Sequence, residues 1–169
     1  MTAKRGEFNI PRASEHGFTL VEIMIVVSII GLLTVLAIPA IRNAFLHAQN
    51  STFISDMRSL TNNAFEQFAF ERGDYPPNTA PGVVPLEIVP YLPKHFSWAN
   101  KTPIGGRWDW DRAANRGDTI YGVYAGLSVY QPARTTPQMR EVDKLVDDGN
   151  LLTGRFRSRL NGYIYILEE

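Results

Sequence analysis

The 169-residue sequence contains no cysteine. Its absence excludes disulfides, thiolate nucleophiles and cysteine-ligated metal sites. The sequence also lacks a surplus of charge of either sign, because its 17 basic and 17 acidic residues cancel. Domains that bind nucleic acid usually carry a basic surplus, so we expect no nucleic-acid partner.

Motifs that signal catalysis are also missing. The sequence has no G-x-S-x-G elbow, no Walker loop and no H-E-x-x-H helix. Its three histidines, His16, His47 and His95, are scattered without the spacing of metal ligands. We therefore expect no enzymatic activity.

The longest uncharged segment runs for nineteen residues, from Ile23 to Ile41. A helix of this length spans about 28 Å, close to the hydrocarbon thickness of a bilayer. Ser28 and Thr34 can return their hydroxyls to the helix backbone. These features predict a transmembrane segment at about 18–41. A cleaved signal peptide, ending near Ala37, is the alternative, but the run exceeds the usual apolar region of about 7–15 residues.

The segment before this run, residues 1–17, is polar and carries the positive charges of Lys4, Arg5 and Arg12. Positive charges that flank a membrane span favour the cytoplasmic side. We therefore predict a cytoplasmic N-terminus. Glu22 sits just inside the predicted span, where a carboxylate is costly and for that reason indicates a function.

A helical pattern continues beyond the apolar run. Apolar residues recur three or four positions apart, with one step of five, as in an amphipathic helix: Ile41, Phe45, Ala48, Phe53, Met57, Leu60, Ala64 and Phe68. Gly73 can end this helix in a left-handed conformation, and Pro76 and Pro77 prevent its continuation. The pattern predicts one helix from Phe18 to Arg72, whose second half packs on a small domain.

Residues 73–169 read as that domain. Trp108 and Trp110 alternate with Asp109 and Asp111, which predicts a strand with one aromatic face and one polar face. The other expected elements are a short helix at 85–89, a strand at 120–130, a helix at 136–147 and a hairpin of 155–160 with 163–167 around Asn161-Gly162. We predict an α+β fold with three or four antiparallel strands that cover the amphipathic helix.

Three carboxylates, Asp143, Asp147 and Asp148, lie near the end of the predicted helix at 136–147. The first two are four residues apart and therefore share one helix face. Oxygen-rich clusters suit Ca²⁺, although solvated or turn-capping carboxylates are the simpler interpretation. We therefore expect no cofactor, and a calcium ion on these carboxylates is the alternative.

The hexapeptide from Gly17 to Glu22, GFTLVE, resembles the cleavage signature of type IV pilin-like proteins. That family includes type IV pilins and the pseudopilins of type II secretion and competence systems. The resemblance implies that a prepilin peptidase cuts between Gly17 and Phe18 and that Phe18 is then N-methylated. It also implies that Glu22 pairs with the terminal amine of a neighbouring subunit during filament assembly. Gly31 and Pro39 weaken the helix, and would let it unwind locally when it leaves the bilayer.

The Tyr75-Pro76-Pro77 loop and the Gly105 to Trp110 segment resemble the major pseudopilins of type II secretion, the G class. The resemblance implies three regions: a leader at 1–17, a long helix at 18–72 and a periplasmic domain at 73–169. It implies a single-pass protein of the bacterial inner membrane that joins a homo-oligomeric filament with other pseudopilins and an assembly platform. An extracellular type IV pilin, or a membrane-tethered periplasmic enzyme or binding domain, remains the alternative.

Overall fold

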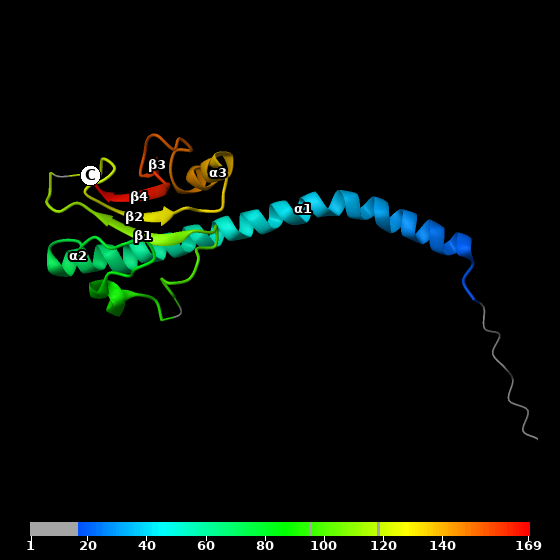
Figure 1. The fold of residues 1–169 in the computed structure, drawn as a ribbon, viewed down its shortest axis with the longest axis horizontal. Helices are drawn as coiled ribbons and strands as arrows, with labels where there is room; N and C mark the ends of the chain where they lie inside the picture. The colour runs from blue at the N-terminus through cyan, green and yellow to red at the C-terminus, as the bar shows by residue number, and fades with distance from the viewer. Residues whose placement is uncertain (1–16, 95, 118) are drawn as a thin grey trace, which may run out of the picture. The chain divides into compact units, whose positions relative to one another are not determined.

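The computed structural model describes residues 17–94, 96–117 and 119–169, so His16, His95 and the basic leader residues lie outside it (Figure 1). The chain separates into two compact units, one up to Asn43 and one from Ala44 to Glu169. Helix α1 (Leu20–Leu60) begins in the first unit and ends in the second. It begins two residues later than the predicted Phe18, because Thr19 caps it.

The described part of the first unit is the apolar portion of α1, and its large side chains are exposed. Its hydroxyls bond as predicted, because Ser28 Oγ donates to the Met24 carbonyl at 2.7 Å and Thr34 Oγ1 to the Ile30 carbonyl at 2.7 Å. Among the described residues, one helix, Leu20–Arg72, is long and apolar enough to cross a membrane.

In the second unit, a π-helical turn η1 (Thr61–Phe65) follows α1, and α2 (Glu66–Arg72) follows η1. Gly73 ends α2 with a φ of 79°, and its N–H donates to the Ala69 carbonyl at 2.8 Å, which confirms the predicted stop. Five residues of the predicted apolar stripe are buried: Phe53, Met57, Leu60, Ala64 and Phe68. Ile41, Phe45 and Ala48 are exposed instead, because the helix meets the domain core only from Asn50 onward.

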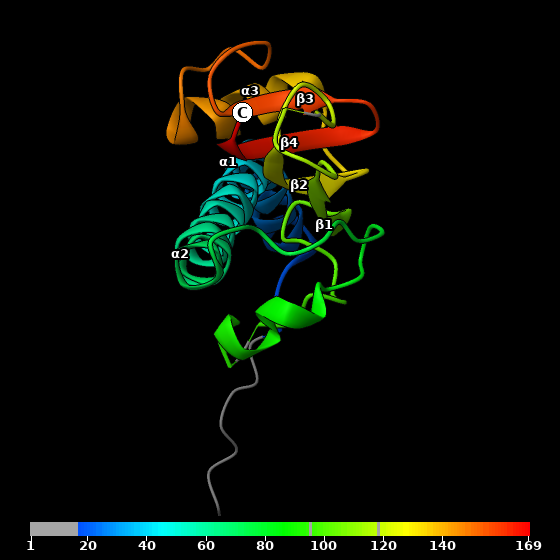
Figure 2. The ribbon, with the colours of Figure 1, turned by 90° about the vertical axis from the view of Figure 1, so that its left-hand side faces the viewer.

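Four antiparallel strands form one sheet in the order β1-β2-β4-β3. They are β1 (Arg107–Arg112), β2 (Ala125–Tyr130), β3 (Phe156–Arg159) and β4 (Gly162–Glu168). Figure 2 shows one face of this sheet against the helix formed by the end of α1 and α2. A long helix and an antiparallel sheet confirm the predicted α+β class.

The aromatic face of β1 makes the core. Trp108 stacks on Phe53 with ring centroids 5.2 Å apart, and Trp110 stacks on Phe65 at 3.8 Å. Trp110 Nε1 also donates to the Pro76 carbonyl at 2.9 Å, which satisfies its buried N–H. The alternation of Trp and Asp therefore predicted the two faces of β1 correctly.

Two turns differ from the prediction. The strand expected from Ile120 begins only at Ala125, because Ile120 and Val123 close a tight turn with Tyr121 at a φ of 56°. In the last hairpin the two loop residues are Leu160 and Asn161. Asn161 supplies the left-handed conformation with a φ of 68°, so Gly162 is free to begin β4.

Two helices accompany the sheet. The expected helix at 85–89 is a 3₁₀ helix, η2 (Leu86–Tyr91). Helix α3 (Thr136–Val146) is capped by Thr135, whose N–H donates to Gln138 Oε1 at 3.0 Å. Met139 and Val142 of α3 are buried as expected, but Leu145 is exposed and Asp143 is fully buried. The prediction from the apolar pattern was therefore wrong at one side of the buried helix face.

Candidate functional site

The predicted processing site lies just before α1. Gly17, Phe18 and Thr19 are outside any helix or strand, and the Phe18 side chain is 83% exposed. Exposed backbone without secondary structure is the kind that proteases cut. The structure therefore presents the Gly17–Phe18 bond in an accessible segment.

Glu22 lies in the first turn of α1 and forms a capping box with Thr19. The Thr19 N–H donates to Glu22 Oε2 at 2.9 Å, and Thr19 Oγ1 donates to the same oxygen at 3.0 Å. The Glu22 N–H donates in turn to Thr19 Oγ1 at 3.2 Å. A carboxylate here also interacts favourably with the positive end of the helix dipole. Sequence reasoning missed Thr19, although T-x-x-E is the signature of a capping box.

The other two residues assigned to this region, Gly31 and Pro39, lie further along α1 and do not join Glu22. Pro39 is inside a continuous helix, and a side chain at Gly31 would meet nothing within 4 Å. Gly31 is therefore not required by close packing in the single chain. Their predicted role in local unwinding stays a prediction.

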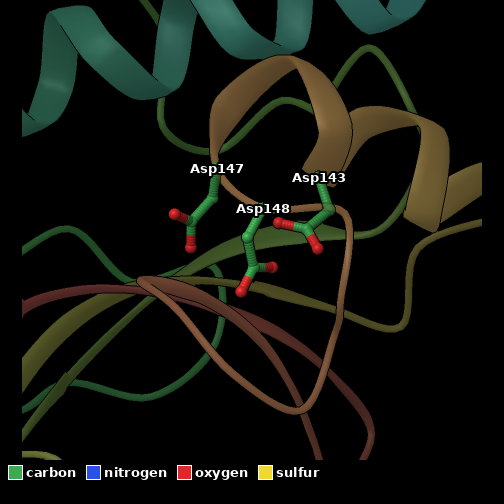
Figure 3. Close-up of side chains that lie close together, drawn as sticks. All are labelled: Asp143, Asp147 and Asp148. Carbon is green, nitrogen blue, oxygen red and sulfur yellow. The ribbon is translucent and has the colours of Figure 1, made fainter.

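The three carboxylates near the end of α3 do come together (Figure 3). One carboxylate oxygen from each of Asp143, Asp147 and Asp148 lies within 4.8 Å of the others. Asp148 accepts from the Asn150 N–H at 2.7 Å and from Thr153 Oγ1 at 2.7 Å. The two exposed aspartates thus have turn-forming roles, since Asp147 also accepts from backbone N–H groups at the start of β3.

Asp143 is different because its side chain is fully buried and neither carboxylate oxygen has a hydrogen-bond partner. Burial, with repulsion from Asp148 and Asp147, raises the pKa of Asp143 to about 6. An ionised carboxylate in this position is costly unless a cation or a proton compensates it.

A second charged cluster lies on the sheet face opposite the aromatic core. Arg159 Nη2 donates to Asp109 Oδ2 at 2.6 Å, and Arg159 Nη1 donates to Asp111 Oδ2. Ser128 Oγ donates to Asp111 as well. Sequence reasoning placed the two aspartates on one polar face but missed Arg159, which comes about fifty residues later in the chain.

The N-terminal segment, the exposed apolar helix and the α+β domain together resemble a type IV pilin-like protein. The prokaryotic N-terminal methylation motif matches residues 12–38, which include the capping box and most of the apolar run. Residues 12–16 of that match lie outside the described part of the chain.

A curated relative narrows this class. The chain is 35% identical over 87 residues to the type II secretion system core protein G of Escherichia coli (strain K12). The match covers 52% of this chain and 59% of that relative, so it spans well under two thirds of the relative's length. No solved structure matches the chain significantly. The motif and the relative support a type IV pilin-like pseudopilin.

Proposed function

We propose that this chain is a non-enzymatic structural subunit of a pseudopilus that acts in type II protein secretion. The observation that carries the proposal is the Gly17 to Glu22 hexapeptide, which lies inside the matched methylation motif and leads into the exposed apolar helix. The similarity to a type II secretion core protein favours secretion over an extracellular pilus.

Maturation begins with cleavage after Gly17 by a prepilin peptidase, followed by N-methylation of Phe18. The exposed, non-helical backbone at 17–19 supports access to this bond. Cleavage leaves a terminal amine on Phe18, four residues before Glu22. The apolar run then holds the subunit in the membrane until it is assembled.

Assembly depends on Glu22, which pairs with the terminal amine of a neighbouring subunit. A carboxylate and an ammonium group are each costly in lipid, and they compensate each other only when they meet. Pairing therefore selects one axial register between subunits. The capping box supports this role, because all three of its bonds use Oε2 or the Thr19 hydroxyl and Oε1 takes no part in them.

Gly31 and Pro39 allow α1 to unwind locally as the subunit leaves the bilayer. Proline removes a backbone donor and glycine lowers helix propensity, so both positions weaken the helix where they stand. The absence of a packing requirement at Gly31 in the single chain supports a role in flexibility.

The subunit occupies the bacterial inner membrane as a single-pass protein before assembly. Its N-terminus is cytoplasmic and residues 73–169 are periplasmic. Its partners are further copies of itself, other pseudopilins, the prepilin peptidase and an inner-membrane assembly platform, with lipid as its surroundings before assembly. One apolar helix near the N-terminus supports this arrangement.

Mass analysis of the mature N-terminus tests the proposal directly. We expect the chain to begin at N-methylated Phe18 in cells that contain a prepilin peptidase, and at Met1 in cells that lack one. A bulky residue in place of Gly17 should block the cut. A mature chain that begins beyond Ala37 would instead identify a secretory signal peptide, and would overturn the assembly function.

Type IV pili and pseudopili share this maturation, so localisation separates them. A pseudopilin supports secretion and remains in the cell envelope at normal abundance. Deletion of the gene should therefore leave exoproteins in the periplasm without loss of surface fibres. Loss of surface fibres with normal secretion would favour the pilin alternative.

We further propose that Asp143, Asp147 and Asp148 hold a Ca²⁺ ion that stabilises the loop between α3 and β3. The specific observation in favour is the buried Asp143 carboxylate, whose two oxygens lack partners beside two further carboxylates. Hard oxygen donors suit calcium. The ion would neutralise the mutual repulsion of the three side chains and tie the end of α3 to the loop that leads into β3.

A further inference from the structure

The charged cluster on the outer face of the sheet has an unequal number of charges. Asp109 and Asp111 supply two carboxylates, while Arg159 supplies one guanidinium group. All three side chains are at most 8% exposed, so solvent screens them little. With both aspartates ionised, the cluster carries a net charge of one negative, because the single guanidinium group balances only one of the two carboxylates.

Two buried atoms of the cluster, Asp109 Oδ1 and Arg159 Nε, lack hydrogen-bond partners. Asp109 Oδ1 has no hydrogen-bond partner, although Oδ2 of the same carboxylate accepts from Arg159. Burial, and then repulsion from Asp111, raises the pKa of Asp109 to about 6. The ionised Asp109 carboxylate would therefore be stabilised at neutral pH by a second cation beside it.

A pocket of about 460 Å³ opens onto this cluster. Asp109, Asp111 and Arg159 line it together with Tyr121, Tyr130 and the loop at 78–81. The Tyr121 ring lies over the Arg159 guanidinium, with 4.6 Å between the guanidinium carbon and the ring centroid. The tight turn holds Tyr121 there at a φ of 56°, a conformation that is unfavourable for a bulky side chain.

We propose that this pocket binds one ammonium or guanidinium group. The net negative charge of the cluster repels anions, and the two tyrosines of the lining offer aromatic side chains to which cations bind. A neutral group would leave the surplus charge uncompensated. A bound cation would bring the cluster to two positive and two negative charges, the balance that buried ion pairs require.

Two sources can supply such a group. One is a lysine or arginine side chain of a second copy of this chain, which would make the pocket a contact between subunits. The other is a free small cation. The pocket would bind either source through the same chemistry, which does not depend on the proposed filament function. Only the choice between the two sources rests on that function.

Titration of the full chain in detergent micelles with methylguanidinium and methylammonium chloride tests the pocket itself. We expect saturable shifts of the Tyr121 and Tyr130 ring signals in NMR spectra, with none for sodium acetate. Asp109→Asn should weaken binding at least tenfold, because it removes the surplus charge while keeping the shape. Glu87→Gln is the matched control, since it removes an exposed carboxylate that does not line the pocket.

Absence of a saturable shift, or equal binding by the Asp109→Asn variant, would overturn the proposal. If that variant does not fold, Tyr121→Ala provides the test, because loss of an exposed wall residue should weaken binding without removing a core side chain. Assembled filaments then identify the source. Filaments that exclude the probe indicate that a neighbouring subunit fills the pocket, and filaments that bind it indicate a free cation. Failure to form filaments would contradict the proposed function and leave the micelle result standing.

Discussion

Thr19 and Glu22 cap the start of α1 reciprocally, so the glutamate has a structural role in the single chain before any subunit meets it. These bonds hold the carboxylate against Thr19, the residue that follows Phe18. Two properties of Glu22 must be separated by experiment, namely its capping bonds and its charge.

Substitution of Glu22 separates them. Glu22→Gln retains a capping side chain but loses the charge, whereas Glu22→Ala loses both. We expect cleavage of both variants at Gly17, together with loss of filament incorporation in both, measured by sedimentation of sheared filaments. Glu66→Ala removes an exposed acid from α2 and should assemble normally. Normal filaments from Glu22→Gln would show that capping, and not charge pairing, is what assembly needs.

Calcium should stabilise the domain through the carboxylate cluster. We expect addition of millimolar CaCl₂ to the chelator-treated full chain in detergent to raise its melting temperature by several degrees. Asp143→Asn should remove most of this increase, and Glu141→Gln, an exposed neighbour on α3, should keep it. An equal increase in wild type and Asp143→Asn would contradict the site.

Without calcium, the stability should depend on pH through Asp143. Its pKa is raised from 3.8 to about 6 in the folded chain, so the folded state binds more protons than the unfolded state between these values. Stability should therefore fall as pH rises from about 4 to 6 and then level off, by roughly 1 to 3 kcal/mol. The comparison of wild type with Asp143→Asn isolates this contribution, because Asp109 adds a loss of the same sign. Identical pH profiles would refute it.

Phe65 and Phe70 offer a matched pair for the packing of the helix on the sheet. Phe65 is fully buried and stacks on Trp110, whereas Phe70 is 91% exposed. We expect Phe65→Ala to cost about 3–5 kcal/mol and Phe70→Ala less than about 0.5 kcal/mol. Thermal unfolding followed by near-ultraviolet circular dichroism measures both. Similar losses in the two variants would mean that the stacked pair does not hold the domain together.

Features with a local cause could be predicted from the sequence. Gly73 ends its helix because a glycine reaches the left-handed conformation easily, and Trp108 and Trp110 share a face because strands alternate. The exposed position of Ile41 was not predictable from periodicity, since that pattern does not say where the domain begins to cover the helix.

Features that depend on distant pairing escaped prediction. Arg159 belongs to β3 and reaches Asp109 and Asp111 of β1 across the two strands between them, and that strand order cannot be read from the polar residues of any single strand. Likewise, the spacing of Asp143 and Asp147 placed them on one helix face without indicating that Asp143 is the buried member. Thr19 was readable as a cap but was missed, because Glu22 was interpreted as a costly membrane charge that pairs with a neighbouring subunit and not as a partner within its own helix.

The π-helical turn at Thr61–Phe65 has a consequence for the phase of the helix. A turn closed by i→i+5 bonds contains about one residue more than an α-helical turn. The residues after it therefore lie at a different angle about the helix axis than the same sequence would have in an unbroken α-helix. Here the wider turn lets Ala64 and Phe65 both face the core while Phe68 still reaches η2. Deletion of one residue between Thr61 and Phe65 would let the segment close as a regular α-helix and would leave Phe68 facing the same side, because the wide turn already accommodates that residue. The wide turn thus accommodates one additional residue without moving the last two turns away from the core.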